Sequence, residues 1–185
     1  IGSVHKFLFE KGDNRMISGN PNDKVYTPEF IVDEVLGIFL PMVGSKEYVL
    51  EPFKGGGAFF DKLPQERVDW CEIDQGRDFF EYKYKVDWII TNPPYSIFKE
   101  VLPKCLEVAN NTVLVIPVNK LLSSMPRLMD IKRAGCNIKQ VHYLGSGGQL
   151  GFPFGFPVAA VHIRKGYVGN LITTYADRCY DAKRK

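Results

Sequence analysis

The tetrapeptide Asn92-Pro93-Pro94-Tyr95 follows directly after an apolar run at residues 86–91, and it limits what this chain can fold into. The run has the length and the β-branched and aromatic content of a buried strand. Because proline cannot donate to a strand ladder, the paired prolines end that strand at once. The sequence therefore predicts a stiff loop, carrying an asparagine and a tyrosine, at the end of a buried strand.

Strand-like and helix-like segments alternate around this motif. We expect a helix over residues 27–40, capped by Thr27 with Pro28 in its first position, and further helices at 96–109 and 125–135. Short apolar runs predict strands at residues 48–50, 68–73, 86–91, 113–117, 138–144 and 158–163, with a strand stub at 78–80 and a short helix from residue 58. This alternation predicts an α/β fold with a mostly parallel sheet covered on both faces. The connection before residues 158–163 is too short for a helical crossover, so we expect that strand to be antiparallel.

The 185 residues are enough for one domain with a substantial core. We expect an N-terminal extension at residues 1–22, the main domain at 23–165 and a polar, basic, frayed tail at 166–185. The net charge of +3 permits nucleic-acid binding without requiring it. The four cysteines are widely spaced, which argues against a metal site and favours buried thiols in a reducing compartment. No apolar stretch approaches the length of a membrane span, so we expect a cytoplasmic protein.

Two loops carry residues suited to a nucleotide-like ligand. Gly55 and Gly57 follow the strand expected at 48–50, where glycine lets the backbone approach a ligand closely. The spacing is neither the GxGxxG fingerprint nor a P-loop, so a tight turn remains an alternative. Glu72 ends the next strand, where a carboxylate can accept both ribose hydroxyls. Asp78 follows shortly after, although both acids can equally be solvated turn residues.

The Asn-Pro-Pro-Tyr loop suits the chemistry of an aromatic amine. Such amines are poor nucleophiles because the nitrogen lone pair delocalises into the ring. The side-chain oxygen of Asn92 and the carbonyl of Pro93 can accept both N–H bonds and leave that lone pair directed at a methyl donor. Tyr95 can stack on a base turned out of its helix. Catalysis would then depend on placement and electrostatics, with no metal.

These motifs together resemble the S-adenosylmethionine-dependent DNA methyltransferases that act on the N6 amine of adenine. The run from Glu51 to Ala58 is similar to their cofactor motif, and Asn92-Pro93-Pro94-Tyr95 matches their catalytic tetrapeptide. Tyr26-Thr27-Pro28 resembles the segment that contacts the methionine end of the cofactor. The motif order is similar to the gamma arrangement, and the likeness covers residues 23–165. It implies a Rossmann-like class I methyltransferase fold.

The resemblance also implies roles for particular residues. Glu72 would hold the ribose, Asp78 the adenine amine of the cofactor and Phe79 the face of its ring. Only a few residues separate Glu72 from Asp78, which leaves no room for the helix usual at this point. The chain also lacks room for a separate target-recognition domain. The resemblance therefore implies a compact, solitary or phage-borne enzyme in a bacterial cell or a phage-infected host. The implied cofactor set is Tyr26, Thr27, Pro28, Glu51, Pro52, Phe53, Gly55, Gly57, Glu72, Asp78 and Phe79, and the catalytic set is Asn92, Pro93, Pro94 and Tyr95.

A Gly/Phe-rich segment at residues 147–157 is the remaining unusual feature. Three phenylalanines on such a loop are costly if exposed. They can form a stacking wall for a base or a wedge against DNA, or they can plug the open end of the sheet. Candidate base-stacking residues are Tyr95, Phe152, Phe154 and Phe156. Basic residues that can meet phosphate are Lys99, Lys120, Arg127, Lys132, Arg133, Arg164 and Lys165.

The leading interpretation is a DNA adenine-N6 methyltransferase whose partners are adenine-containing DNA and a separate specificity subunit or a second copy of the chain. An RNA adenine or a protein-glutamine methyltransferase is an alternative, since both can use an Asn-Pro-Pro-aromatic loop. A catalytically silent nucleic-acid-binding subunit is another. Glu51-Pro52-Phe53 differs from the Asp-Leu-Gly that usually opens the cofactor loop of the glutamine enzymes. The intact glycines and the intact tetrapeptide argue against a silent subunit.

Overall fold

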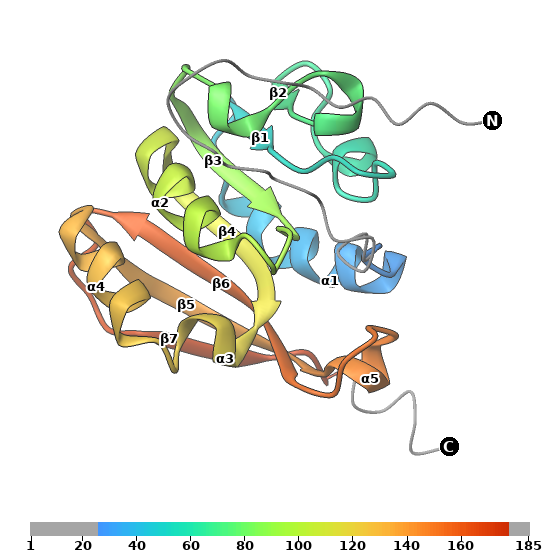
Figure 1. The fold of residues 1–185 in the computed structure, drawn as a ribbon, viewed down its shortest axis with the longest axis vertical. Helices are drawn as coiled ribbons and strands as arrows, with labels where there is room; N and C mark the ends of the chain where they lie inside the picture. The colour runs from blue at the N-terminus through green and yellow to red at the C-terminus, as the bar shows by residue number, and fades with distance from the viewer. Residues whose placement is uncertain (1–25, 178–185) are drawn as a thin grey trace, which may run out of the picture.

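The computed structural model describes residues 26–177. Its strands are β1 (Val49–Glu51), β2 (Val68–Trp70), β3 (Val86–Thr91), β4 (Ala109–Pro117), β5 (Cys136–Ser146), β6 (Pro157–Lys165) and β7 (Ile172–Tyr175). In this part of the chain they form one seven-stranded sheet in the order β2-β1-β3-β4-β6-β5-β7 (Figure 1). Strand β6 runs antiparallel to both β4 and β5, whereas the other neighbours pair in parallel. The predicted α/β fold and its antiparallel strand near the C-terminus are therefore confirmed.

Helices cover both faces of this sheet (Figure 1). Helix α1 (Glu29–Phe39) buries its apolar side against one face, together with alternate residues of the central strands such as Trp88 and Val113. Helices α2 (Phe98–Val108) and α4 (Met125–Arg133) pack on the opposite face, against the intervening residues such as Ile89 and Leu114. This alternation follows from the two-residue period of a strand, which sends successive side chains to opposite faces. Two short helices, α3 (Val118–Leu121) and α5 (Gly147–Leu150), follow β4 and β5.

Three local predictions were wrong. Residues 78–80 form no strand, because the chain turns there into the 3-10 helix η5 (Phe79–Glu81). Within the described residues β2 consequently pairs with β1 alone and is an edge of the sheet. The helix expected from residue 58 is reduced to the 3-10 helix η3 (Phe60–Lys62). Thr27 does not cap α1: the N-cap is Pro28, with no side-chain hydrogen bond, and the Thr27 hydroxyl has a different partner, described below.

The segment expected as a polar tail contributes a strand. Strand β7 lies parallel to β5, pairing Gln140 with Ile172 and Tyr143 with Tyr175. The rings of Tyr143 and Tyr175 stack with centroids 5.6 Å apart. Most residues of β7 are exposed, so the strand has no buried apolar pattern to predict it. Strand β7 pairs with residues about 30 positions earlier in the chain, so its own sequence does not predict the pairing.

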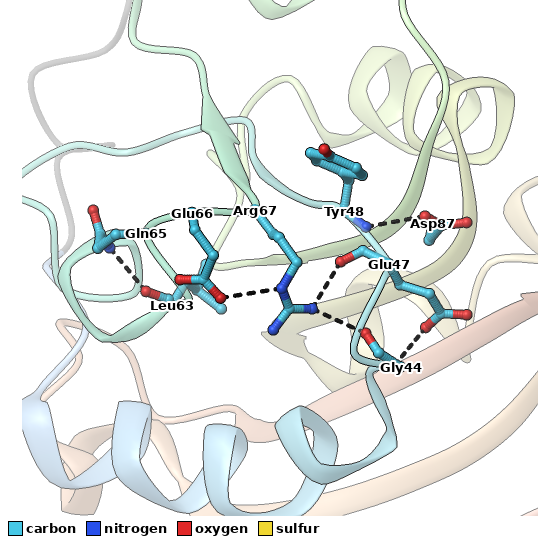
Figure 2. A network of polar contacts seen from close by, with 8 residues as sticks. All are labelled: Gly44, Glu47, Tyr48, Leu63, Gln65, Glu66, Arg67 and Asp87. Carbon is cyan, nitrogen blue, oxygen red and sulfur yellow. Dashed lines mark hydrogen bonds and ion pairs between the residues drawn. The ribbon is translucent and has the colours of Figure 1, made fainter.

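A polar network fixes the amino ends of the strands, at the edge opposite the site described below (Figure 2). Arg67 Nη1 donates to the carbonyl oxygens of Gly44 and Glu47, at 2.9 and 3.1 Å. The backbone amide of Tyr48 donates to Oδ2 of Asp87 at 3.0 Å, which joins the start of β1 to β3. These contacts stabilise the strand register at the amino ends of the strands. The candidate functional loops lie at the opposite, carboxyl ends.

No helix among residues 26–177 is both long and apolar enough to cross a membrane. Cys71, Cys105 and Cys136 are buried free thiols, and burial raises the pKa of Cys71 to about 11. They are therefore protonated and unreactive at neutral pH. Cys179, the expected extension at residues 1–22 and the end of the expected tail lie outside the described residues.

Candidate functional site

The candidate site lies at the carboxyl edge of the sheet, where β1 and β3 are neighbours. The chain passes from β1 outward to β2 and then returns to β3 on the other side of β1. In open α/β sheets such a reversal opens a crevice beyond the strand ends, and ligands bind there. Glu51 ends β1 and Asn92 directly follows β3, so two of the predicted motifs meet at this crevice.

The loop after β1 depends on its glycines. Gly55 and Gly57 have φ values of +51° and +91°, in the region that favours glycine. A Cβ on Gly57 would lie 2.8 Å from Oδ2 of Asp61, so a larger residue would have to displace the Asp61 side chain as well as adopt a strained conformation. The amide of Gly57 donates to the carbonyl of Lys54 at 2.8 Å, which closes the turn. The segment after β1 is therefore a tight turn, in which Gly55 and Gly56 are exposed and Gly57 is buried.

The acid after β2 holds this loop. Glu72 Oε2 accepts a hydrogen bond from the amide of Gly55 at 2.6 Å, and Oε1 accepts one from the amide of Asp74 at 3.2 Å. Its side chain also caps the 3-10 helix η4 (Ile73–Gln75). Glu72 therefore lies beside the glycine loop and is bonded to it.

Glu51 lies beneath the loop and joins it to β3. Its side chain is 1% exposed, and Oε1 accepts hydrogen bonds from the Thr91 hydroxyl at 2.5 Å and from the amide of Phe53 at 3.0 Å. Burial raises the pKa of Glu51 from its ordinary 4.5 to about 8, against the opposing effect of these two hydrogen bonds. At neutral pH the carboxyl group is largely protonated, so it can donate as well as accept. Sequence reasoning missed Thr91, whose position directly before Asn92 was the available signal.

The amide of Asn92 is hydrogen-bonded at both ends. Its Nδ2 donates to Oγ1 of Thr27 at 2.8 Å. Its Oδ1 accepts from the Tyr95 hydroxyl at 2.7 Å, and that hydroxyl also lies 3.4 Å from the carbonyl oxygen of Val115. The catalytic and cofactor segments of the resemblance therefore meet directly, although 65 positions separate Thr27 from Asn92.

A pocket of about 250 Å³ opens beside this contact. The exposed ring of Tyr26 borders it, close enough that a Cβ on Gly56 would lie 3.0 Å from Tyr26 Cε1. Pro28 is half-buried, and Pro52 and Pro93 are buried in the loops that shape the crevice. The lining residues are Tyr26, Thr27, Glu29, Gly56, Gly57, Ala58, Asp61 and Lys62.

Asp78 and Phe79 have structural roles. Asp78 Oδ1 accepts from the amide of Phe80 at 2.8 Å and so caps η5. The ring of Phe79 is 2% exposed and meets the ring of Phe53 edge-on, with centroids 5.3 Å apart. Because no crossover helix precedes η5, the chain turns Phe79 into the core. In this conformation its ring face is covered by other side chains.

The three loop phenylalanines occupy different environments. Phe152 is buried, Phe156 is 54% exposed, and Phe154 lies between them. The ring of Phe154 stacks on Phe152 at 5.3 Å and meets the ring of Tyr95 edge-on at 5.7 Å. Of the three, Phe154 is therefore the one in contact with the Asn-Pro-Pro-Tyr loop.

The basic side chains predicted to meet phosphate are spread over several elements. Arg127 donates to the carbonyl of Lys120 at 2.6 Å, and its guanidinium lies 5.4 Å from the ring centre of Phe98. These contacts tie α4 to α3 through Lys120 and to α2 through Phe98. They give Arg127 a structural role at the end of β4.

Comparison with known proteins shows that the structure of this chain is similar to solved structures. No protein-family model matches the sequence, and no curated protein does. A protein from Listeria monocytogenes described as a class I S-adenosylmethionine-dependent methyltransferase superimposes with a TM-score of 0.63 at 12% identity, covering 90% of this chain and 70% of that one. A protein from Pyrococcus horikoshii described as an RNA methyltransferase gives 0.58 at 18% identity, covering 80% of this chain and 91% of that one.

A third structure is a methyltransferase subunit of a type I restriction-modification system from Streptococcus thermophilus. It gives a TM-score of 0.56 at 14% identity and covers 86% of this chain. The present chain spans about half of that subunit, 52% of its length. The three matches have identities of 12%, 18% and 14%, so the likeness lies in the fold. The described part of this chain therefore has the class I methyltransferase fold.

Proposed function

We propose that this protein transfers a methyl group from S-adenosylmethionine to the N6 amine of adenine in DNA. The observation that carries the proposal is the position of Asn92 and Pro93, which follow β3, with Asn92 bonded to Thr27 at the pocket that Gly56 and Gly57 also line. An acceptor pair for an amine and a loop suited to a nucleotide-like cofactor thus share one crevice. The class I methyltransferase fold supports the same cofactor.

The residues present fit S-adenosylmethionine. Gly55 and Gly56 are exposed in the loop after β1, so their backbone would be open to a ligand. Glu72 would hold the ribose hydroxyls, Tyr26 would border the cofactor, and Glu51 would support the loop from below. The bound cofactor supplies an activated methyl group on a sulfonium centre.

The protein's own contribution is to orient the amine. Asn92 Oδ1 and the carbonyl of Pro93 would accept the two N–H bonds of adenine N6 and leave the lone pair free to attack. Oδ1 already accepts from the Tyr95 hydroxyl, and a carbonyl oxygen has a second lone pair for the amine. The amine nitrogen would gain the methyl group as the carbon–sulfur bond to that methyl group breaks, with its electron pair left on the sulfur, and would then release one proton to solvent.

Aromatic side chains would hold the base. The rings of Tyr95 and Phe154 meet edge-on next to Asn92, so a base entering between the loops can stack on one of them. Phe156 is more exposed and would lie further from the reacting atom.

RNA is the second candidate substrate. It is favoured by the Pyrococcus horikoshii protein, of which the chain covers 91% and which is described as an RNA methyltransferase. An adenine amine offers the same two N–H bonds in either nucleic acid, so Asn92 does not discriminate between them. For the DNA function we propose a separate specificity subunit or a second copy of the chain as partner, in line with the subunit from a restriction-modification system.

The test is methyl transfer from labelled S-adenosylmethionine to pools of single- and double-stranded DNA, RNA and protein, followed by nucleoside analysis. We expect N6-methyladenine in DNA. Asn92→Ala should lose about 10²–10³ in single-turnover rate, by analogy with other preorganised acceptors and donors, while its cofactor affinity stays unchanged. Methylation of RNA or protein alone would overturn the DNA assignment. Cofactor binding without transfer to any pool would identify a silent subunit.

A further inference from the structure

Thr27 makes a contact that its expected role does not explain. The resemblance assigns it to the methionine end of the cofactor, and the helix pattern predicts a cap for α1. In the structure it does not cap α1, and its Oγ1 accepts a hydrogen bond from Nδ2 of Asn92 at 2.8 Å. The Thr27 residue is 8% exposed, so little solvent is available to replace this partner.

The orientation of the Asn92 amide matters for the proposed chemistry. Its oxygen accepts hydrogen bonds, whereas its nitrogen carries two donors. Rotation of the group by 180° would present N–H groups to an amine that itself needs an acceptor. The observed orientation places Oδ1 by the Tyr95 hydroxyl and Nδ2 by Thr27.

The hydroxyls of Thr27 and Tyr95 can each donate or accept, so neither excludes the rotated amide by itself. Tyr95 favours the observed orientation, because its hydroxyl donates to Oδ1 at 2.7 Å and lies 3.4 Å from the alternative acceptor, the carbonyl oxygen of Val115. The contact with Thr27 holds the other end of the amide, at Nδ2. Without the Thr27 hydroxyl, Nδ2 would lose its partner and the amide would be held at Oδ1 alone.

We propose that Thr27 is a positioning residue for methyl transfer: its hydroxyl oxygen holds Nδ2 of Asn92, so that Oδ1 faces Tyr95 and the target amine. The inference rests on the proposed function and gives Thr27 a role beyond cofactor contact. It couples the segment before α1 to the loop after β3. Thr27 acts through Asn92 and need not touch the reacting atoms.

The matched variants are Thr27→Val, which keeps the shape without the hydroxyl, and Thr27→Ser, which keeps the hydroxyl. Single-turnover rates are measured at saturating cofactor and DNA, and cofactor affinity is measured separately by calorimetry. Thr27→Val should slow transfer about 10- to 100-fold, as misplacement of a reacting group does, and Thr27→Ser should restore most of the rate. A wild-type rate for Thr27→Val at saturation, with only the affinity lowered, would overturn the inference.

A double-mutant cycle separates positioning from general disruption. Combined with Asn92→Ala, Thr27→Val should cause little further loss, because residues that act through one another are not additive. A full additional loss would show that Thr27 acts independently of Asn92. If Thr27→Ser and Thr27→Val slowed transfer equally, the hydroxyl would not be the group that positions Asn92.

A spectroscopic measurement keeps the inference testable if the wild type methylates no adenine, an outcome that refutes the proposed function itself. The side-chain amide signal of Asn92 in a ¹H–¹⁵N spectrum is assigned with Asn92→Ala. Thr27→Val should shift this signal and speed its exchange with water, whereas Thr27→Ser should not. An unchanged signal in Thr27→Val would refute the hydrogen bond on which the inference rests.

Discussion

The carboxylate of Glu72 accepts a 2.6 Å hydrogen bond from the backbone amide of Gly55, so the acid after β2 holds the glycine loop after β1. A charge-assisted bond of this kind is stronger than one between neutral groups. It keeps the loop in place next to the carboxylate proposed to bind the ribose. The loop and the acid therefore form one unit, although they follow different strands.

This contact predicts that Glu72→Ala weakens cofactor binding. Loss of a charge-assisted acceptor should cost about 1.5–3 kcal/mol, or roughly 10- to 150-fold in Kd measured by calorimetry. Glu72→Gln keeps an acceptor for Gly55 and should fall between the wild type and the alanine variant. Unchanged affinity in Glu72→Ala would remove this residue from the cofactor site.

Gly57→Ala should destabilise the protein more than Gly55→Ala. Both residues have positive φ, but a Cβ on Gly57 would lie 2.8 Å from Asp61 Oδ2, whereas the nearest atom to one on Gly55 is 3.9 Å away. We expect about 1–3 kcal/mol for the strained backbone at Gly57, with the contact adding to it. Urea unfolding measures the difference, and Asp61→Ala in the Gly57→Ala background should recover the steric part. Equal losses at the two glycines would contradict this explanation.

Phe154→Ala should weaken productive DNA binding while Phe156→Ala has a smaller effect. Phe154 meets the ring of Tyr95, and loss of one stacking ring costs about 1–3 kcal/mol. Phe154→Leu is the matched control for packing against Phe152, because it keeps apolar volume without a stacking face. The comparison uses kcat/KM on DNA with thermal unfolding alongside. A larger loss in Phe156→Ala would transfer the stacking role to that residue.

Glu51 should make stability depend on pH. Its pKa is raised from 4.5 to about 8 by burial, so the folded state holds a proton that the unfolded state releases. Stability from this group is complete below pH 4.5 and is lost as the pH rises through about 8. Glu51→Gln, which cannot ionise, should therefore gain stability relative to the wild type between pH 5 and pH 9, by about 1.4 kcal/mol per unit of pKa difference at most.

Denaturant unfolding of both proteins across this range isolates the contribution of Glu51, because all other groups are shared. A constant difference between wild type and Glu51→Gln would mean that Glu51 titrates normally in the folded protein.

Local sequence was enough to predict the loops and most of the strands. The paired prolines at 93 and 94 had to end β3, and Gly55 and Gly57 had to follow a strand as a turn, because each constraint lies in the backbone of the residues themselves. The short connection before β6 likewise dictated its reversed direction. These features arise from residues that are adjacent in the chain, so they can be predicted from a single sequence.

Only the tertiary structure determined which side chains contact one another. The sequence predicts that Thr27 caps a helix. In the structure its hydroxyl instead accepts a hydrogen bond from Asn92, because the strand order and the start of α1 bring the two residues together. Phe79 reads as a ligand contact, yet the missing crossover turns it onto Phe53 in the core. Among the three loop phenylalanines, the ring contact with Tyr95 belongs to Phe154. Such contacts join residues far apart in the chain, and their distances are set by strand register and packing, which no local pattern encodes.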